Sequence, residues 1–159
     1  MIVPVLAVAL VTAGATVFHE AAFRDPSGLR DTPWGMEQGA DTPRTVDKGE
    51  QSNIDAAKQV VLRTDAEWTK LWQQHSPDRQ RPAVDFSKDM IVGVFMGSRS
   101  SAGYNISIVS TFAKDGNVLV RYQESTPRPG TMTAQVLTFP YHLVAIPKAA
   151  GEVRFEKVQ

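Results

Sequence analysis

The apolar run at residues 90–96 places the strongest constraint on the fold of this chain. It reads Met-Ile-Val-Gly-Val-Phe-Met and contains no polar side chain. A short apolar run rich in β-branched residues is typical of a strand that is buried on both of its faces. We therefore expect residues 90–96 to form a strand inside the protein rather than along its surface.

Two later segments alternate between apolar and polar residues, which predicts half-buried strands at residues 104–113 and 118–123. The expected inward faces carry Tyr104, Ile106, Ile108 and Phe112 in the first segment and Val118, Val120 and Tyr122 in the second. The opposite faces carry Asn105, Ser107 and Thr111, and Arg121 and Gln123. Asp115-Gly116 lies between the two segments and suits the positive φ angles of a tight turn. An antiparallel hairpin is therefore expected here.

Five further segments have the composition of strands: residues 44–51 at a sheet edge, 59–63, 133–138, 142–146 and 152–157. Gly151 is expected to form the turn between the last two. Turn signals recur about every ten residues, which favours consecutive antiparallel pairing. The predicted fold class is α+β, mainly antiparallel β: a sandwich or partly open barrel of about six to eight strands with one short helix.

The one helix is predicted directly after residues 59–63. Thr64 and Glu67 have the spacing of a capping box, in which each side chain satisfies a backbone N–H of the other residue. Trp68, Leu71, Trp72 and His75 follow at helical spacing on one face, and Ser76-Pro77 ends the helix. We interpret the two Trp as core anchors, with a ligand cage as the alternative.

The N-terminal residues resemble an export signal. Residues 1–19 contain no Asp, Glu, Lys or Arg, residues 2–11 are apolar apart from Pro4, and Ala13-Gly14-Ala15 fits a cleavage site. We expect a signal peptide at residues 1–15, a flexible tether at 16–43 that is rich in Pro and Gly, and a β-rich domain at 44–159. An uncleaved anchor or a buried strand remains the alternative for the apolar run. Trp34 and Met36 leave open a docked anchor within the tether.

Charge balance and missing residue types exclude several classes of function. The 159 residues include 17 Lys+Arg and 17 Asp+Glu, so the net charge is +0 and lacks the basic excess of a nucleic-acid-binding protein. Cys is absent, which excludes disulfides, thiolate metal sites, a Cys nucleophile and a lipid-modified Cys. The three His are far apart in sequence, with no pair at i+4. No metal or cofactor is therefore expected.

A search for catalytic patterns assigns no residue. Residues 97–103 are rich in Ser but lack the Gly-x-Ser-x-Gly pattern and precede a strand rather than a helix. We interpret them as a polar turn, with an anion-binding loop around Arg99 or a catalytic Ser as alternatives. Asp85, Asp89 and Glu124 could meet in space, but their spacing does not predict it. His142 is expected to make structural hydrogen bonds, with a role on a binding surface as the alternative.

Three junctions at strand ends are candidates for a contact surface: residues 102–104, 127–130 and 139–142. Prolines stiffen two of them, and antiparallel strands can gather such junctions at one end of a sheet. We expect at least two of the three to lie in contact. The candidate partner-binding residues are Arg99, Gly103, Tyr104, Pro127, Arg128, Pro129, Phe139, Pro140, Tyr141 and His142. The alternative is that these segments only form turns between strands and that Tyr104 belongs to the core.

Several of these segments together resemble the C-terminal domain of the PrcB-like protease-complex subunit family. The longest matching string lies at residues 84–97 and reads Val-Asp-Phe-Ser-Lys-Asp-Met-Ile-Val-Gly-Val-Phe-Met-Gly. Ala-Gly-Tyr-Asn-Ile at 102–106, Pro-Arg-Pro-Gly at 127–130 and Phe-Pro-Tyr-His-Leu-Val-Ala-Ile-Pro at 139–147 add to it. Glu-Trp-Thr-Lys-Leu-Trp at 67–72 matches the Trp-x-x-x-Trp helix of such proteins, so the resemblance spans roughly residues 44–157.

The resemblance implies an accessory subunit that binds and stabilises a secreted protease, with no catalytic residues to carry over. Such subunits resemble exported lipoproteins, but this chain has no Cys to carry a lipid. We therefore expect a periplasmic or secreted, non-enzymatic protein-binding module, free or held by an uncleaved signal, with no membrane span in its mature form. The alternatives are a protease inhibitor that uses the same loops, a periplasmic small-molecule or glycan binder, and an enzyme of unknown type.

Overall fold

The computed structural model of the protein describes residues 43–159. The predicted signal peptide and all of the predicted tether except Pro43 lie outside these residues. Within the described part, no helix is both long enough and apolar enough to cross a membrane.

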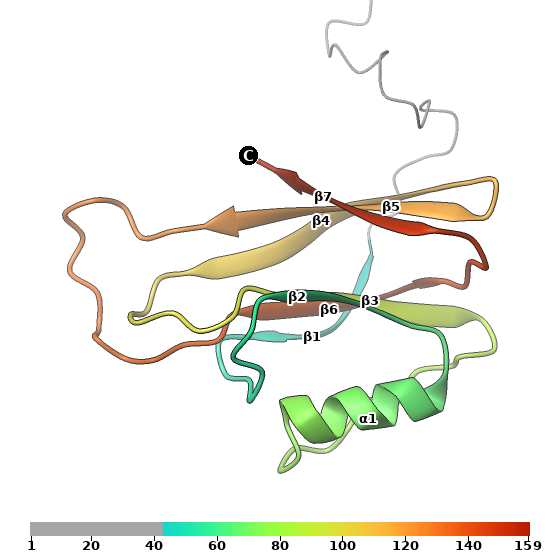
Figure 1. The fold of residues 1–159 in the computed structure, drawn as a ribbon, viewed down its shortest axis with the longest axis horizontal. Helices are drawn as coiled ribbons and strands as arrows, with labels where there is room; N and C mark the ends of the chain where they lie inside the picture. The colour runs from blue at the N-terminus through green and yellow to red at the C-terminus, as the bar shows by residue number, and fades with distance from the viewer. Residues whose placement is uncertain (1–42) are drawn as a thin grey trace, which may run out of the picture.

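The described residues form three layers: one helix, a four-stranded sheet and a three-stranded sheet (Figure 1). The four-stranded sheet has the order β1-β6-β3-β2 and the three-stranded sheet the order β4-β5-β7. The strands are β1 (Arg44–Gly49), β2 (Lys58–Leu62), β3 (Asp89–Phe95), β4 (Asn105–Lys114), β5 (Asn117–Ser125), β6 (Tyr141–Pro147) and β7 (Val153–Val158), and the helix is α1 (Asp65–His75). This confirms the predicted α+β class: the two sheets form a sandwich with a single short helix outside it.

Strand β3 is buried on both faces, as its apolar sequence predicts. It lies between β6 and β2, and every residue from Met90 to Phe95 is buried. Met90, Val92 and Val94 pack into the core between the two sheets. Ile91 and Phe95 point the other way and pack into a second core, beneath the helix. Alternate residues of one strand therefore pack into two cores, which explains why residues 90–95 carry no polar side chain.

Helix α1 begins and packs as predicted. Thr64 Oγ1 accepts from the Glu67 N–H at 3.3 Å, and Glu67 Oε2 accepts from the Thr64 N–H at 3.1 Å, which completes the capping box. Trp68, Leu71, Trp72 and His75 are all buried. The indole N–H groups of Trp68 and Trp72 donate to the carbonyls of Pro82 and Arg79. The interpretation of both Trp as core anchors is confirmed.

The β4–β5 hairpin is confirmed, but its inner face differs from the predicted one. Asp115 and Gly116 have φ angles of 51° and 78°, which the tight turn requires. A bulge between Ile108 and Ser110 then interrupts the alternation in β4. Beyond this bulge the inward residue is Thr111, which is buried, rather than Phe112. The prediction was wrong for these two positions because one extra residue in a strand exchanges its two faces.

Residues 133–138 do not form a strand, contrary to prediction. Only an isolated bridge joins Thr138 to Arg99. The preceding strand β5 already has β4 and β7 on its two sides, and the following strand β6 already has β1 and β3. Neither neighbour in sequence offers a free edge, so the segment remains a loop.

The connection from β6 to β7 crosses between sheets and is not the predicted turn of a strand pair. Strand β7 pairs with β5 in parallel, whereas every other strand pair is antiparallel among the described residues. Gly151 lies against the hairpin turn, where an added Cβ would come within 2.5 Å of the Gly116 carbonyl oxygen. Arg63 donates to the carbonyls of Ala149 and Gly151 at 3.1 and 2.6 Å and holds this crossing to the end of β2.

Candidate functional site

Two connections lie side by side at one end of the sandwich and together form what we call the loop-end surface, residues 98–104 and 126–139. Residues 126–139 join β5 to β6 and extend well beyond the sheets, opposite the β4–β5 hairpin turn (Figure 1). Residues 98–104 lead into β4 along the base of this longer loop. Seven of the predicted contact residues and all of the predicted 127–130 turn lie on these two segments.

Hydrogen bonds fix the base of the loop-end surface. Arg99 and Thr138 exchange two backbone hydrogen bonds of 2.8 Å, and the Ala102 N–H donates to the Ala134 carbonyl at 3.0 Å. Thr138 Oγ1 donates to the Ser101 carbonyl at 3.1 Å. These bonds tie the second half of the longer loop to the shorter one, so the two segments act as a single structure.

The predicted contact between strand-end junctions is present for two of the three. Gly103 has a φ angle of 94°, and a Cβ added there would lie 3.1 Å from Pro127 Cγ. Residues 102–104 and 127–130 therefore touch. A side chain at position 103 would be strained and would also push against the proline, which accounts for the glycine.

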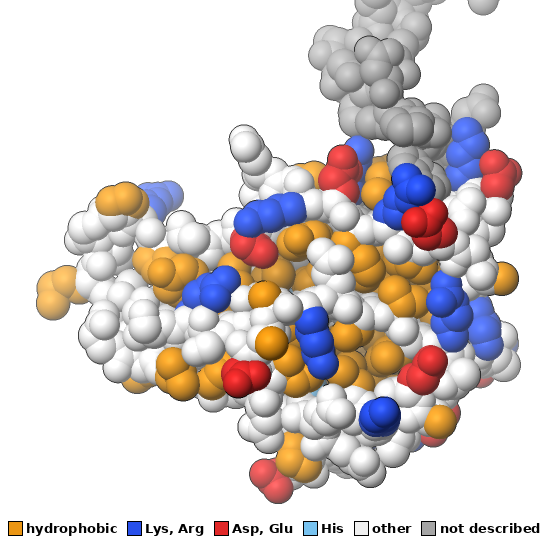
Figure 2. Space-filling model, viewed as in Figure 1, with side chains coloured by type: hydrophobic (Ala, Val, Ile, Leu, Met, Phe, Trp, Pro, Cys, Tyr) orange, Lys and Arg blue, Asp and Glu red, His pale blue; other side chains and the backbone are white. Residues whose placement is uncertain are grey.

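The loop-end surface exposes large apolar side chains. Met132 is 98% exposed, Leu137 58% and Val136 49%. In the space-filling view, hydrophobic side chains project from the loop at this end (Figure 2). Sequence reasoning missed Val136 and Leu137 because it placed residues 133–138 in a strand of the sheet, where half of the side chains would have been covered. It missed Met132 because this residue lies between that expected strand and the expected 127–130 turn.

The charge on the loop-end surface is small and of one sign. Arg99 and Arg128 are its only charged residues, and it contains no Asp or Glu. The Arg99 guanidinium lies 5.7 Å from the centre of the Tyr104 ring and donates to the Ser98 carbonyl at 2.8 Å. This surface is therefore apolar and weakly basic on a chain whose net charge is +0.

The family comparison covers this surface completely. Residues 90–147 match the family model described as PrcB C-terminal. This stretch is a PrcB-like C-terminal domain. It runs from β3 to β6 and includes both segments of the loop-end surface. No curated protein and no solved structure matched the chain.

Four predicted contact residues lie at the other end of the longer loop, and three of them are buried. Pro140, Tyr141 and His142 are buried, and Phe139 is half-buried. Tyr141 and His142 belong to β6, which has strands on both sides and a core on both faces. A contact surface in the PrcB-like domain therefore does not include Tyr141 or His142, and their assignment to it is corrected.

His142 instead joins the two sheets, as the structural interpretation of this residue expected. Its Nδ1 accepts from the Ile108 backbone N–H at 2.8 Å, so its Nε2 carries the proton and donates to Thr45 Oγ1 at 2.9 Å. The first bond reaches β4 in one sheet and the second reaches β1 in the other. Burial, with a smaller contribution from Lys48, lowers the pKa of His142 to about 4. The ring is therefore neutral at pH 7, as this pair of hydrogen bonds requires.

A second polar network has the order Ser-His-Asp, which the sequence did not reveal. Ser52 Oγ lies 2.8 Å from His75 Nδ1, and His75 Nε2 lies 3.4 Å from Asp47 Oδ2. These residues come from three separate segments, and no motif links them. Such an order is found in nucleophilic catalysis, where a hydroxyl is activated by a base that a third group orients.

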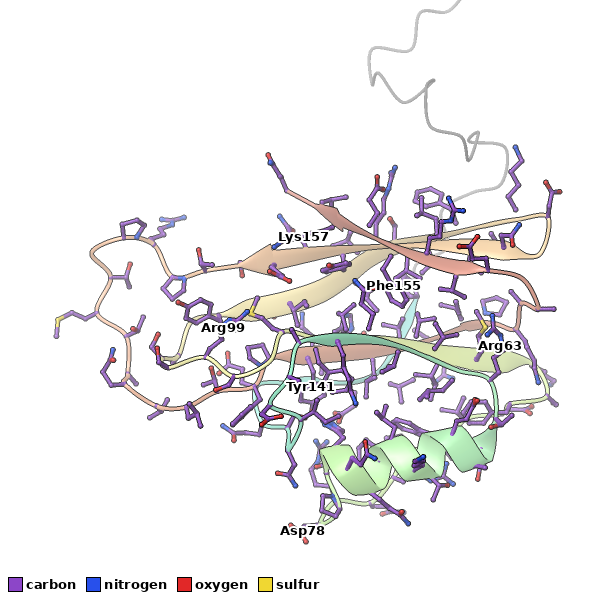
Figure 3. The ribbon with its side chains drawn as sticks, viewed as in Figure 1. Arg63, Asp78, Arg99, Tyr141, Phe155 and Lys157 are labelled. Atoms are coloured by element: carbon purple, nitrogen blue, oxygen red, sulfur yellow. The ribbon has the colours of Figure 1, made fainter. Side chains whose placement is uncertain are left out.

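The surroundings of this network favour a structural role over a catalytic one. Ser52 is only 7% exposed, and its Oγ already accepts from the Ile54 N–H at 3.0 Å. Tyr141, marked in Figure 3, donates to Asp47 at 2.9 Å, and Arg79 binds both Asp47 oxygens at 3.0 Å. The network thus joins β1 and the helix to β6 of the PrcB-like domain and does not present a nucleophile to solvent.

The ionisation of the network follows from these contacts. Burial alone would raise the pKa of Asp47, but hydrogen bonds from Arg79, Tyr141 and His75 outweigh burial and lower it. Burial lowers the pKa of His75, although Asp47 opposes this. Burial also raises the pKa of Tyr141 to about 12. The state at neutral pH is thus an Asp47 carboxylate that accepts from a cation, a phenol and a neutral imidazole.

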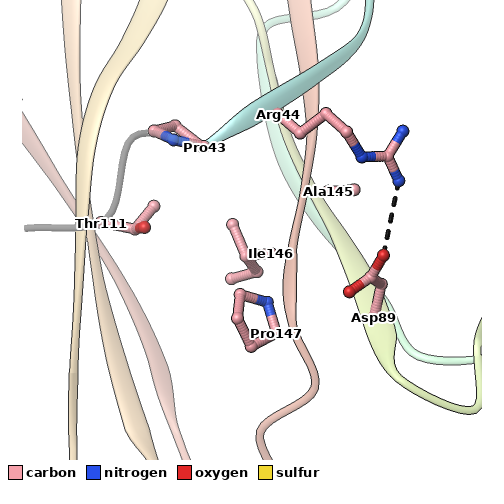
Figure 4. Close-up of a pocket in the computed structure, with 7 residues that line it drawn as sticks. All are labelled: Pro43, Arg44, Asp89, Thr111, Ala145, Ile146 and Pro147. Atoms are coloured by element: carbon pink, nitrogen blue, oxygen red, sulfur yellow. Dashed lines mark hydrogen bonds and ion pairs between the residues drawn. The ribbon is translucent and has the colours of Figure 1, made fainter.

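Two shallow pockets of about 300 and 320 Å³ open between the sheets. The first lies beside the start of β1, where Arg44 and Asp89 pair at 3.4 Å (Figure 4). The second includes Glu124, which pairs with Lys157 at 2.6 Å. Their volumes are at the lower limit of small-molecule sites, and ion pairs already engage these polar groups. Among residues 43–159, no cluster of His, Asp and Glu could hold a metal ion.

Proposed function

We propose that this chain is an exported, non-enzymatic protein-binding module that acts as an accessory subunit of a secreted protease. The match of residues 90–147 to the PrcB C-terminal model suggests a subunit of the protease-complex accessory type. The observation that carries the proposal is the loop-end surface, where Met132, Val136 and Leu137 are exposed within the matched stretch. Exposed apolar side chains grouped on one projecting loop are a common feature of protein-contact surfaces.

The physical basis of an accessory role is differential affinity. A subunit that binds the folded protease and not its unfolded chain shifts the folding equilibrium by mass action, without any chemistry of its own. The backbone bonds between Arg99 and Thr138 and from Ala102 to Ala134 hold the base of the loop before any partner is present. A surface ordered in advance loses less conformational entropy on binding, which favours affinity.

The non-enzymatic part of the proposal is supported by the two polar networks. In both of them the hydrogen-bonding groups face one another inside the fold. His142 has both ring nitrogens engaged, and Ser52 has its oxygen engaged by a backbone N–H. These arrangements fit the stabilisation of the PrcB-like domain and its neighbouring strands.

The test is to immobilise the full chain, pass an envelope extract of its source over it and identify the bound proteins. A bound protease is then purified and heated with and without the full chain. We expect a larger fraction of protease activity to survive in the presence of the chain. A stoichiometric loss of activity would instead support the protease-inhibitor alternative. Failure to retain any protease would contradict the proposal.

A further inference from the structure

Residues 131–137 have the sequence of a strand but lack a strand's pairing. They read Thr-Met-Thr-Ala-Gln-Val-Leu, with three β-branched residues and no charge, Pro or Gly. Such a composition favours a paired, half-buried strand. In the structure, however, the segment belongs to neither sheet. Its preference for extended pairing is therefore not satisfied within residues 43–159.

The backbone of this segment keeps one side open. Its one main-chain hydrogen bond to the shorter loop is from the Ala102 N–H to the Ala134 carbonyl. Among residues 43–159, no hydrogen bond is found from the backbone N–H groups of residues 132–137. These donors are left to water, as they are along the free edge of a sheet. Residues 99–102 occupy one side, so a second strand has access to the other.

A turn precedes the segment and backbone hydrogen bonds to other segments hold its end, so it is a presented strand rather than a free tail. At its start, the Thr131 N–H donates to the Arg128 carbonyl at 3.0 Å, and Gly130 between them has a φ angle of 81°. At its end, Thr138 is held by Arg99, and the Phe139 N–H donates to the Glu50 carbonyl at 2.8 Å. The segment thus runs from a turn in the longer loop to an end that is bonded to residues 50 and 99.

We infer that residues 131–137 dock on the partner as an added β-strand, an inference that rests on the proposed function. The partner would offer an open strand edge or an extended peptide-binding groove, with apolar pockets for Met132 and Val136. Backbone pairing supplies the unused donors with acceptors, and pockets for alternate side chains give specificity. The absence of any charge in the segment suits an apolar groove, and Arg99 and Arg128 beside it suit acidic groups on the partner's rim.

The test uses the full chain with a photo-reactive benzoylphenylalanine at position 132, in cells of its source. The control carries the same group at position 115, in the exposed hairpin turn at the opposite end of the sandwich (Figure 1). We expect position 132 to cross-link one protein on the order of tenfold more than position 115 does. We also expect the cross-linked peptide to lie in an edge strand or groove of that protein. Equal cross-linking at both positions, or an adduct with lipid or with a second copy of this chain, would overturn the inference.

Backbone pairing is tested separately from side-chain contact. Gln135→Pro removes one N–H from the open edge, whereas Gln135→Ala removes only the side chain. We expect the proline variant to reduce capture of the cross-linked protein by roughly tenfold and the alanine variant to leave it nearly unchanged. Both variants should melt at the temperature of the parent chain, since the Gln135 N–H makes no hydrogen bond among the described residues. Equal capture by the two variants would exclude strand addition.

Side-chain contact has a matched control in Val109. Val136 and Val109 are 49% and 45% exposed, but Val109 lies in the β4 bulge and outside the loop-end surface. Val136→Ser should weaken capture, and Val109→Ser should not. A cross-linked protein that is not a protease would refute the proposed function and leave strand addition intact. A captured protease whose cross-links do not depend on position 132 would refute strand addition alone.

Discussion

His142 makes hydrogen bonds to both sheets, and these bonds depend on its protonation state. Its ring must accept from Ile108 and donate to Thr45 at once, and only the neutral imidazole can do both. A protonated ring has no acceptor nitrogen, so it would leave the Ile108 N–H without its partner. One hydrogen bond between the two sheets, beside their shared apolar core, therefore depends on a group that titrates in mild acid.

The expected consequence is a loss of stability as the pH falls. The pKa of His142 is about 4 in the folded protein and about 6.5 in an unfolded chain, so the unfolded state binds more protons between these values. The contribution of His142 is fully present above about pH 6.5 and decreases as the pH falls towards 4, by up to about 3 kcal/mol. Urea unfolding at pH 7, 5.5 and 4 measures this.

His142→Gln serves as the control, because it cannot titrate. Its free energy of unfolding should be lower at pH 7 and should change less between pH 7 and 4 than that of the parent chain. The pKa of His75 is lowered as well, so some dependence in the same direction remains in the variant. An unchanged dependence on pH would show that His142 does not contribute.

Tyr141 gives a second test at the scale of single residues. Its hydroxyl donates to Asp47 at 2.9 Å and accepts from Arg79 at 3.1 Å. We expect Tyr141→Phe to lower the free energy of unfolding by about 1–3 kcal/mol, because Asp47 then loses a donor in a buried place. Tyr104→Phe is the matched control and should cost less, since Tyr104 is half-buried. A cost for Tyr141→Phe no larger than for Tyr104→Phe would contradict this account of the network.

At the scale of elements, helix α1 covers the outer face of the four-stranded sheet. The rings of Trp68 and Trp72 meet edge to face with their centres 5.1 Å apart, and Trp72 meets His75 in the same way at 5.3 Å. Their positions at i, i+4 and i+7 bring them onto one face, and the sheet supplies Ile91, Phe95 and Leu143 beneath them. A helix of 11 residues is marginally stable on its own, so packing against the sheet stabilises α1.

Replacing either tryptophan should separate the helix from the sheet. Trp68 and Trp72 are 0% and 4% exposed, so we expect Trp68→Ala or Trp72→Ala to cost about 3–5 kcal/mol of unfolding free energy. Gln73→Ala on the exposed face should stay within about 0.5 kcal/mol of the parent chain. Chemical denaturation followed by tryptophan fluorescence and circular dichroism measures the difference. A cost below about 1 kcal/mol for either Trp would contradict the helix packing described here.

At the scale of the whole molecule, the proposed function depends on export. The uncharged residues 1–19 and Ala13-Gly14-Ala15 motivate the expectation that the mature protein begins near Thr16. The intact mass of the protein isolated from its source measures this directly. A full-length species found in the cytoplasm would contradict both the signal peptide and a partnership with a secreted protease.

The features that the sequence predicted correctly are those with local causes. The capping box of Thr64 and Glu67, the turn at Asp115-Gly116 and the all-apolar strand β3 each depend on residues a few positions apart. Local sterics and side-chain periodicity are sufficient to predict them. The family resemblance likewise rested on short strings, and the match over residues 90–147 confirmed it.

Which segments pair as strands, and which of their side chains are buried, became clear only from the tertiary structure. Residues 133–138 have strand composition but meet no free edge, whereas β7 pairs in parallel with β5 across the sheet. Tyr141 and His142 looked like loop residues after Pro140, but the two cores that enclose β6 bury them. Strand pairing and burial are set by contacts between residues far apart in the chain, and one bulge at Val109 was enough to exchange the faces of β4.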